Sequence, residues 1–323
     1  MINAYSASGA PKPLSPSEAL DRLPDDIVWL DMLHPTPEED AYVERLLGID
    51  VPTRDDLKDI EPSSRLYIDK GSVFMTGSLV YRADGPDPQL TDIAFILTGG
   101  RLLTVRYAEP KSFQLFIAAL ARNSTLVRDG ETMLGKLLET IADRTAEILE
   151  HTVDHIDRLS TDIFRNRGSR RPPRFLEDKL ADIAQFHRLV GKVRDSLGSL
   201  SRLLSFLQNV PSIRDDKADD SLCRTVAHDV ETLSEHASFI AGNIAFLLDA
   251  SLGLINVEQN AIIKIFSIAS VVFLPPTLVA SIYGMNFHVM PELEWHFGYP
   301  LAIMGMIMSA IIPFFIFRWK GWL

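Results

Sequence analysis

Cysteine is almost absent from this chain of 323 residues, and Cys223 is its only one. A single cysteine excludes an intrachain disulfide framework and a cluster of thiolate metal ligands. Cys223 lies in a helical pattern and is expected to be a small buried hydrophobe. The segment from Met1 to Pro16 lacks a basic start and an apolar core. It therefore predicts no cleavable signal peptide, and the N-terminal part is expected in the cytoplasm.

Basic residues are also scarce, with 32 Lys and Arg against 43 Asp and Glu and a formal net charge of −11. Because such a chain repels phosphate backbones, no nucleic-acid partner is expected. The acidic balance suits the accumulation of cations, but it is also an ordinary composition for a soluble surface. The chain lacks the phosphate-binding, dinucleotide-binding and nucleophile-elbow motifs, and we predict that it is not an enzyme.

Charge is missing altogether from two late stretches, Ile265 to Tyr283 and Pro300 to Phe317. Each approaches the roughly 20 apolar residues that a helix needs to cross a bilayer. Two buried core helices are the alternative, which their length and their position after a long charged helix disfavour. We predict a first membrane helix at about 265–283, an outer loop at 284–299 and a second membrane helix at about 300–317.

The charges around these stretches predict an orientation. Lys264 precedes the first stretch, and Arg318 and Lys320 follow the second, whereas the loop has no Lys or Arg and carries Glu292 and Glu294. The positive-inside rule therefore places both termini in the cytoplasm and the loop outside. Aromatic residues expected at the membrane interfaces are Trp295, Tyr299, Trp319 and Trp322.

Residues 1–130 predict a cytoplasmic α+β domain with a mixed sheet and helices. Gly99-Gly100 is a hairpin signal between two of its strands. Capping boxes at Ser15–Glu18 and Thr36–Glu39 predict helix starts, and a further helix is expected over 111–122. The predicted strands are 27–32, 66–69, 73–81, 93–97 and 102–107.

Residues 131–264 predict very long helices that form a funnel. Apolar residues at spacings of three and four, over 134–163 and 176–207, indicate two helices that pack as an antiparallel pair. A third helix starts near Lys217 and, if continuous to Leu274, is roughly 87 Å long. Because no compact domain houses such a helix, we expect it to continue into the membrane hairpin of residues 265–323.

Polar and small residues recur about every 3.5 positions along this third helix. They favour either packing between membrane helices or a face that lines water. The length of the stripe, its two Asn and its Asp favour the second interpretation, a face that lines water. One hairpin has too few helices to enclose water, so several copies of the chain are required around an axis. The polar stripe consists of Asp249, Gly253, Asn256, Asn260, Ile263, Ser267, Ser270, Leu274, Thr277 and Ser281.

The stripe leads to an oxygen-rich outer end. Pro275-Pro276 is expected to loosen the helical hydrogen bonds within the membrane. Gly284 is expected to end the helix, and Asn286 offers an amide oxygen just beyond it. A ring of such oxygens suits Mg²⁺, which takes oxygen ligands and gives up its waters reluctantly. Glu292 and Glu294 would add negative potential outside this mouth.

The same region resembles a known family. The residues that carry the resemblance are Tyr-Gly-Met-Asn-Phe at 283–287, Met-Pro-Glu-Leu at 290–293, Trp295, Phe-Gly-Tyr-Pro at 297–300 and the basic end at 320–323. Together they are similar to the CorA family of magnesium transporters. The Gly-Met-Asn signature and the Met-Pro-Glu-Leu loop are highly specific in combination.

The resemblance implies a homopentameric channel in the bacterial cytoplasmic (inner) membrane, with the lipid bilayer and divalent cations as its other partners. A cytoplasmic α/β domain would lead into a funnel of long helices, and the first membrane helix would line the pore. Mg²⁺ would be transported and would also close the pore from the cytoplasmic side, while Co²⁺ and Ni²⁺ are possible secondary ions. No organic cofactor is implied.

The family pattern also implies roles for particular residues. Gly284, Met285 and Asn286 would form the selectivity mouth, and Asn286 and Asp249 would meet the ion through its hydration shell. Asp249 matches an acidic ring on the cytoplasmic side. Further pore-lining residues would be Asn256, Asn260, Ile263, Phe266, Ser267, Ser270, Leu274, Thr277 and Ser281, of which Ile263, Phe266 and Leu274 look like hydrophobic constrictions.

Two other functions stay open at this point. The first is transport of Zn²⁺ or another transition metal on the same scaffold, which His288 and His296 in the outer loop would suit, although the Met-Pro-Glu-Leu sequence favours magnesium. The second is a membrane-tethered sensor or regulatory protein, which would need no polar stripe. His151 and His155 form an i, i+4 pair that could hold a metal, but we interpret them as surface residues of a helix.

Overall fold

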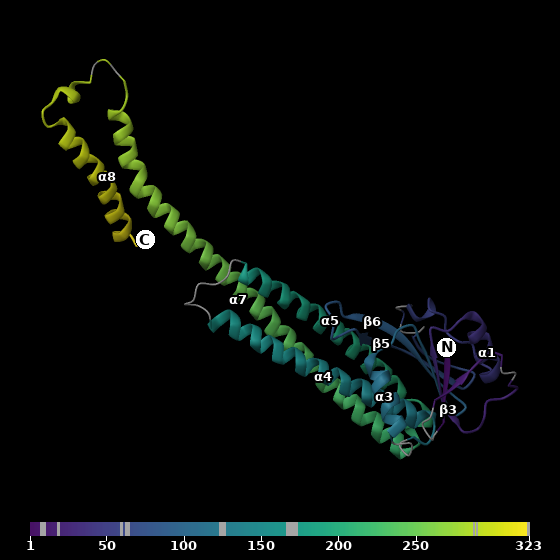
Figure 1. Cartoon of the computed structure of the whole chain (residues 1–323). Helices are drawn as coiled ribbons and strands as arrows, with labels where there is room; N and C mark the ends of the chain where they lie inside the picture. The colour runs from purple at the N-terminus through teal and green to yellow at the C-terminus, as the bar shows by residue number, and fades with distance from the viewer. Residues whose placement is uncertain are drawn as a thin grey trace. The chain divides into compact units, whose positions relative to one another are not determined.

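The computed structural model describes residues 1–6, 11–17, 20–58, 61, 65–122, 127–165, 174–286, 288 and 290–321, apart from the side chains at 165, 292 and 293. The chain forms two compact units (Figure 1). The N-terminal unit comprises Met1–Leu248, and the C-terminal unit comprises Asp249–Leu323.

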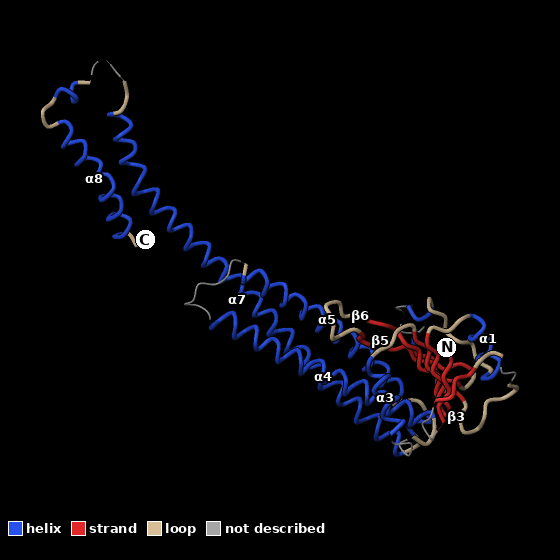
Figure 2. Tube along the Cα trace, in the orientation of Figure 1, coloured by secondary structure: helices blue, strands red, loops and turns tan. Residues whose placement is uncertain are grey.

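The N-terminal unit is built on a seven-stranded sheet in the order β2-β1-β3-β7-β6-β5-β4, red in Figure 2. β3 and β7 are parallel neighbours, while the other neighbouring pairs are antiparallel, so the predicted mixed sheet is confirmed. The strands are β1 (Ile2–Ser6), β2 (Pro11–Leu14), β3 (Ile27–Leu33), β4 (Leu66–Asp69), β5 (Ser72–Tyr81), β6 (Gln89–Thr98) and β7 (Arg101–Arg106).

Helices account for most of the remaining described chain. The predicted helix over 111–122 is confirmed at those bounds as α3. The helices are α1 (Pro37–Leu47), η1 (Asp56–Lys58), α3 (Lys111–Arg122), α4 (Gly130–Arg165), α5 (Phe175–Leu207), α6 (Pro211–Arg214), α7 (Lys217–Tyr283), η3 (Pro291–Glu294) and α8 (Gly298–Trp319).

The sheet is buried on both faces, and β3 shows why. Leu30 and Met32 belong to a core shared with Tyr42 of α1. Trp29, whose side chain points to the opposite face, stacks on Tyr5 of β1 with ring centroids 4.3 Å apart and faces the aromatic residues of α3. Successive side chains of a strand point to opposite faces, so a strand covered on both sides is apolar almost throughout.

One ion pair is buried in this sheet. Arg106 donates two hydrogen bonds to the Asp31 carboxylate, at 2.9 and 2.7 Å. Thr104 donates to the same carboxylate at 2.8 Å and accepts from the indole N–H of Trp29 at 3.0 Å. The guanidinium lies 4.8 Å from the Phe113 ring centroid. Because each charge is satisfied within the network, the strands can hold it in their interior.

Local sequence signals are confirmed at two places. Thr36 accepts from the backbone N–H of Glu39 at 3.3 Å, and the Glu39 carboxylate accepts from the N–H of Thr36 at 3.0 Å, so the predicted capping box is present. Gly99 and Gly100 have φ of 55° and 72° in the turn between β6 and β7. Glycine adopts these left-handed values without steric cost.

The N-terminal segment departs from the sequence prediction. The pair β1 and β2 was not predicted, and the helix predicted at Ser15–Glu18 is wrong over its described residues, which form a turn. Ser15 Oγ accepts from the Ser17 N–H at 3.3 Å, a local bond that competes with helix formation. β2 contains two prolines, Pro11 and Pro13, which an edge strand tolerates.

α4, α5 and the N-terminal part of α7 pack as a bundle. Lys179 of α5 pairs with Asp162 of α4 at 3.0 Å. A Cβ on Gly135 of α4 would lie 2.6 Å from the Leu222 side chain of α7, so the two helices approach closely there. Buried apolar residues of α7 recur at spacings of three, four and seven, typical of a coiled-coil seam. They are Cys223, Val226, Val230, Ala237, Ile240, Ile244 and Leu247.

The prediction for Cys223 is confirmed. The side chain is 3% exposed, and burial raises the pKa of its thiol to about 11. The thiol is therefore protonated at neutral pH, and its role is to pack between helices.

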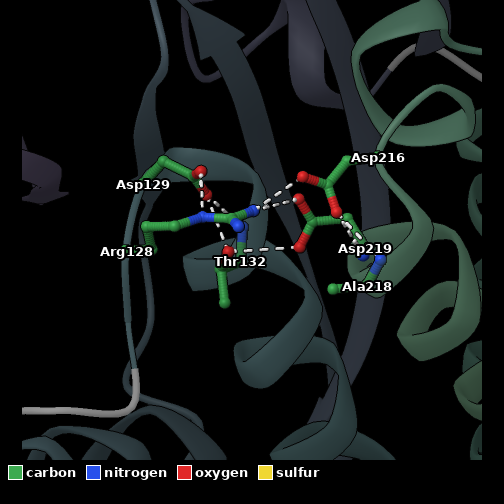
Figure 3. A network of polar contacts seen from close by, with 6 residues as sticks. All are labelled: Arg128, Asp129, Thr132, Asp216, Ala218 and Asp219. Atoms are coloured by element: carbon green, nitrogen blue, oxygen red, sulfur yellow. Dashed lines mark hydrogen bonds and ion pairs between the residues drawn. The ribbon is translucent and has the colours of Figure 1, made fainter.

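Aspartates fasten the starts of α4 and α7 to each other (Figure 3). Asp129 accepts from the N–H of Thr132 at 2.9 Å, and Asp216 accepts from the N–H of Ala218 at 2.8 Å. Arg128 joins the two ends through Asp129 and Asp216, each at 3.0 Å. Backbone donors, together with Arg128, hold the pKa of Asp216 below its usual value. The signal for these caps, Asp three residues before Thr or Asp, was overlooked in the sequence.

Candidate pore helix and outer mouth

In the part of the chain that the structure describes, two helices are long and apolar enough to cross a membrane, α7 and α8. α7 runs over 67 residues, from Lys217 to Tyr283, and α8 over 22. The predicted spans at 265–283 and 300–317 lie within them. The described side chains of α8 are all at least partly exposed, although the helix is almost entirely apolar.

α7 and α8 partly cover each other along one face. On α8 the partly covered positions are Gly298, Ala302, Met306, Ser309, Ala310, Pro313, Phe314 and Phe317. On α7 they are Ile268, Val271, Val272, Pro275, Pro276 and Val279. Both sets have helical spacing. The polar stripe has no member in the α7 set, and all ten of its residues are exposed.

Two hydroxyl groups of the stripe bond within their own helix. Ser270 Oγ donates to the carbonyl of Phe266 at 2.9 Å, and Thr277 Oγ1 donates to the carbonyl of Phe273 at 2.6 Å. Each hydroxyl thus uses its single donor, and its oxygen lone pairs remain available as acceptors. Such a surface offers oxygen atoms to a hydrated cation.

The proline pair lies inside α7, and the helix continues past it to Tyr283. Because proline has no N–H, the carbonyls four residues earlier, those of Val271 and Val272, lose their usual partners. Both valines belong to the face that α8 partly covers. The predicted loosening therefore does not interrupt the helix, and it does not fall on the polar stripe.

The helix ends at the predicted mouth. Gly284 donates its N–H to the carbonyl of Ala280 at 2.9 Å, and Asn286 lies in the non-helical segment that follows. A Cβ on Gly284 would lie 3.2 Å from the Ala280 oxygen, a tight contact that favours glycine. Met285 is 48% exposed, and Asn286 is exposed as well. Phe287 lies outside the described residues.

The outer loop contains one short helical turn, η3, over Pro291–Glu294. Glu294 is exposed, and the side chain of Glu292 lies outside the description. His296, Trp295 and Tyr299 line a cavity of about 410 Å³ with the outer ends of α7 and α8. His296 therefore lines this cavity from the loop side.

The three predicted constriction residues are exposed in the single chain, Ile263 at 60%, Phe266 at 70% and Leu274 at 66%. Asp249, Asn256 and the other stripe residues are exposed too. A single chain leaves these side chains without the neighbours that would make a ring or a constriction.

Within the described residues, no three or more His, Cys, Asp or Glu side chains come together to hold a metal ion. His151 and His155 lie on the exposed surface of α4, as the sequence predicted.

A sheet domain, a bundle of long helices and an apolar hairpin with a polar stripe define a membrane transport protein rather than a soluble enzyme. The sequence model of the CorA-like Mg²⁺ transporter proteins matches residues 24–319. The chain therefore belongs to the CorA family, and the resemblance noted in the sequence is confirmed. This is a family of transporters and not of enzymes.

Curated relatives match along nearly the whole chain. The magnesium transport protein CorA of Pectobacterium atrosepticum is 37% identical over 298 residues, which is 92% of each chain. The Escherichia coli K12 protein of the same name is 34% identical over 296 residues, again 92% of each. The Haemophilus ducreyi protein is 33% identical over 100% of both chains.

Solved structures confirm the fold over the full length. The complete CorA magnesium transporter of Methanocaldococcus jannaschii has a TM-score of 0.75 at 20% identity and covers 100% of this chain and 99% of its own. The full-length CmaX protein has a TM-score of 0.73 at 17% identity, covering 98% and 96%. The cytoplasmic domain of ZntB from Vibrio parahaemolyticus has a TM-score of 0.55 at 12% identity, covering 79% and 98%.

Proposed function

We propose that this chain transports Mg²⁺ across the bacterial inner membrane through a homopentameric gated pore lined by α7. The main observation in support is the course of α7. Its polar stripe is exposed, with Ile263 and Ser267 lining a cavity that α8 also lines, and the helix ends at the Gly-Met-Asn signature of the family. The relatives named as magnesium transport proteins support Mg²⁺ as the main substrate. Co²⁺ and Ni²⁺ are secondary substrates in this proposal.

The homopentamer follows from the exposed faces of the hairpin together with the family resemblance. The polar stripe would be costly against lipid, because intramembrane polar groups normally face a bundle interior or a cavity. In the single chain all of its residues are exposed. Five copies of α7 around one axis would turn each stripe inward and leave the apolar side chains of α8 to the bilayer.

The outer mouth would consist of five copies of Gly284, Met285 and Asn286. An Asn amide oxygen is a neutral acceptor that can hold the waters of a hydrated Mg²⁺ without stripping them. Neutral rings bind weakly enough for the ion to leave again, which conduction requires. Glu292 and Glu294 would concentrate cations outside this ring.

Along the pore, the proposal assigns two kinds of position. Asp249, Asn256 and Asn260 would form oxygen rings toward the cytoplasmic side, with Asp249 meeting the hydrated ion. Ile263, Phe266 and Leu274 would narrow the pore with apolar rings that gate by excluding water. Both termini would lie in the cytoplasm, as Lys264, Arg318 and the acidic outer loop indicate.

Cytoplasmic Mg²⁺ would close this pore by binding the soluble part, as the family resemblance implies. The measurement is limited proteolysis of the intact oligomer at increasing Mg²⁺. We expect slower cleavage of the N-terminal unit as Mg²⁺ rises. Cleavage at the same rate at every Mg²⁺ concentration would contradict regulation by cytoplasmic Mg²⁺. It would not contradict the pore assignment.

The pore is tested by isotope or fluorescent-dye flux in liposomes, with Mg²⁺, Co²⁺, Ni²⁺ and Zn²⁺ compared on one preparation. Asn286→Ala is expected to abolish Mg²⁺ flux or to remove its preference over the other ions. His288→Ala in the outer loop is the matched control and should conduct like the unchanged protein. Intact pentamers without Mg²⁺ flux would overturn the proposal, and a preference for Zn²⁺ would select the transition-metal alternative.

A further inference from the structure

A cavity of about 260 Å³ opens in the N-terminal unit, between α4, α5 and the turn from β5 to β6. Its walls are apolar apart from one patch. The polar side chains of that patch are Asp84, His151, Thr152, His155 and Gln185. The proposed permeation path uses none of these residues, so the cavity has no assigned role.

The ring of His155 is fixed by two contacts. Its Nδ1 lies 2.7 Å from the backbone carbonyl oxygen of His151, and the ring lies against Phe186 with centroids 5.3 Å apart. A carbonyl oxygen only accepts, so Nδ1 carries the proton and donates it. In the neutral ring Nε2 is then left with a lone pair. Metal-binding histidines typically carry this arrangement, in which the other ring nitrogen donates to a carbonyl.

His151 supplies a second imidazole on the same face of α4. Residues four apart on a helix are neighbours, and each side chain leans over the turn that precedes it. The hydrogen bond from His155 to the His151 carbonyl therefore brings its ring over the turn where His151 lies. Both side chains line the same cavity. Two histidines at i, i+4 on one helix face are an established arrangement for Zn²⁺.

Asp84 is not available as a metal ligand, because its carboxylate is already engaged in hydrogen bonds and ion pairs. It accepts from Arg144 at 2.7 and 2.8 Å and pairs with Lys111 at 3.3 Å. Thr152 is engaged as well, since its hydroxyl donates to the carbonyl of Ile148 at 2.7 Å. The two imidazoles and the Gln185 amide are the remaining donor groups of the patch.

We propose that His151 and His155 bind a borderline-soft divalent cation, Ni²⁺, Co²⁺ or Zn²⁺, with water or Gln185 completing the coordination. Imidazole nitrogen suits these ions, whereas Mg²⁺ prefers oxygen ligands. The site would let the cytoplasmic unit bind transition metals in the presence of a large excess of Mg²⁺. It is independent of the proposed pore, since it uses other residues.

The test is calorimetric titration of the full-length, tag-free oligomer with NiCl₂ in millimolar Mg²⁺. One Ni²⁺ per chain is expected at this site. Changes around metal ligands cost about 10–100-fold in affinity, so loss of a ligand in His155→Gln or His151→Gln should weaken Ni²⁺ binding at least about tenfold. His228→Gln, at an exposed histidine of α7, is the control and should bind like the unchanged protein.

A second measurement needs no variant. One equivalent of Cu²⁺ added to the unchanged protein should give an electron paramagnetic resonance spectrum with the hyperfine pattern of two imidazole nitrogens. Fewer than two nitrogens would overturn the proposal. So would unchanged Ni²⁺ affinity in His155→Gln, an equal loss in His228→Gln, or displacement of Ni²⁺ by millimolar Mg²⁺.

Discussion

The sheet domain of the N-terminal unit buries aromatic side chains of a type that the C-terminal unit leaves exposed. In the N-terminal unit, Trp29, Phe95 and Phe113 are each 0% exposed. In the C-terminal unit, Phe266 is 70% and Phe273 is 69% exposed. The sheet domain of the first unit completes its aromatic core within one chain, although Phe239 and Phe246 of α7 in that unit are 64% and 65% exposed. The second presents a large exposed apolar surface, which the bilayer and further copies of the chain would cover in the proposed pentamer.

The largest effect is expected at the buried ion pair. Asp31→Asn leaves Arg106 charged in the sheet interior without its counter-charge, which should lower the free energy of unfolding of the N-terminal unit by about 3–5 kcal/mol. Denaturant titration of the solubilised protein, followed by tryptophan fluorescence, measures it. Asp25 forms an ion pair with Arg22, and its side chain is 84% exposed. Asp25→Asn removes this pair and should change the free energy of unfolding by less than about 1 kcal/mol. Equal losses in both variants would contradict the assigned difference.

The contrast between the units is tested by placing Lys at two residues of equal exposure. Ile311 of α8 is 43% exposed and Leu115 of α3 is 42% exposed. Ile311→Lys should oppose membrane insertion by about 2.5–3.5 kcal/mol, because the charge meets hydrocarbon. Leu115→Lys meets water and should stay within about 0.5 kcal/mol of the unchanged protein. Carbonate extraction of membranes measures the inserted fraction, and similar behaviour of the two variants would remove the contrast.

A smaller effect is expected from close backbone contact at the start of α4. A Cβ on Gly130 would lie 2.4 Å from the Arg101 carbonyl carbon, so Gly130→Ala should force a shift that costs about 1–3 kcal/mol. Gly191 in α5 has nothing within 4 Å of a built Cβ. There, alanine should stabilise the helix by roughly 0.5–1 kcal/mol. The two variants should therefore move the denaturation midpoint in opposite directions.

The smallest effect concerns two similar capping signals. Thr36→Ala removes a formed capping box and should cost about 1 kcal/mol. Ser15→Ala changes a residue of an exposed turn, where the same signal forms no described helix, and should stay within about 0.5 kcal/mol. Thermal unfolding by circular dichroism compares them. A Ser15→Ala loss as large as that of Thr36→Ala would show that the turn contributes more than its local bond suggests.

These pairs also show how far local sequence signals determine structure. The hairpin at Gly99-Gly100, the Thr36 cap and α3 were predicted from their own residues because their bonds are local. β1 and β2 escaped prediction because their strand character comes from pairing with distant β3 and from an edge position that accepts Pro11 and Pro13. A nearly identical capping pattern at Ser15 failed, because the chain there leaves strand β2 in a turn rather than a helix.

For the candidate site, the sequence predicted the stripe, the end of the helix and the signature, but it left two interpretations of the polar residues open. Two observations on the structure argue only against packing of the stripe on the α8 of the same chain. The stripe residues lie outside the face of α7 that α8 partly covers. Ser270 and Thr277 also donate to their own helix rather than to α8. Their roles in the pore stay predictions, because a ring needs several chains.

Sequence alone determined the properties that depend on periodicity and composition. These are the long helices, the charge-free spans and the family signature at 284–286. Each can be read from neighbouring residues along the chain, without knowing which distant segments meet. Only the tertiary structure decided which faces meet. It placed Asp31 against Arg106 across β3 and β7, fastened α4 to α7 through Arg128, and brought His155 to Phe186 beside the turn from β5 to β6. Contacts between distant segments depend on packing, which no local pattern encodes.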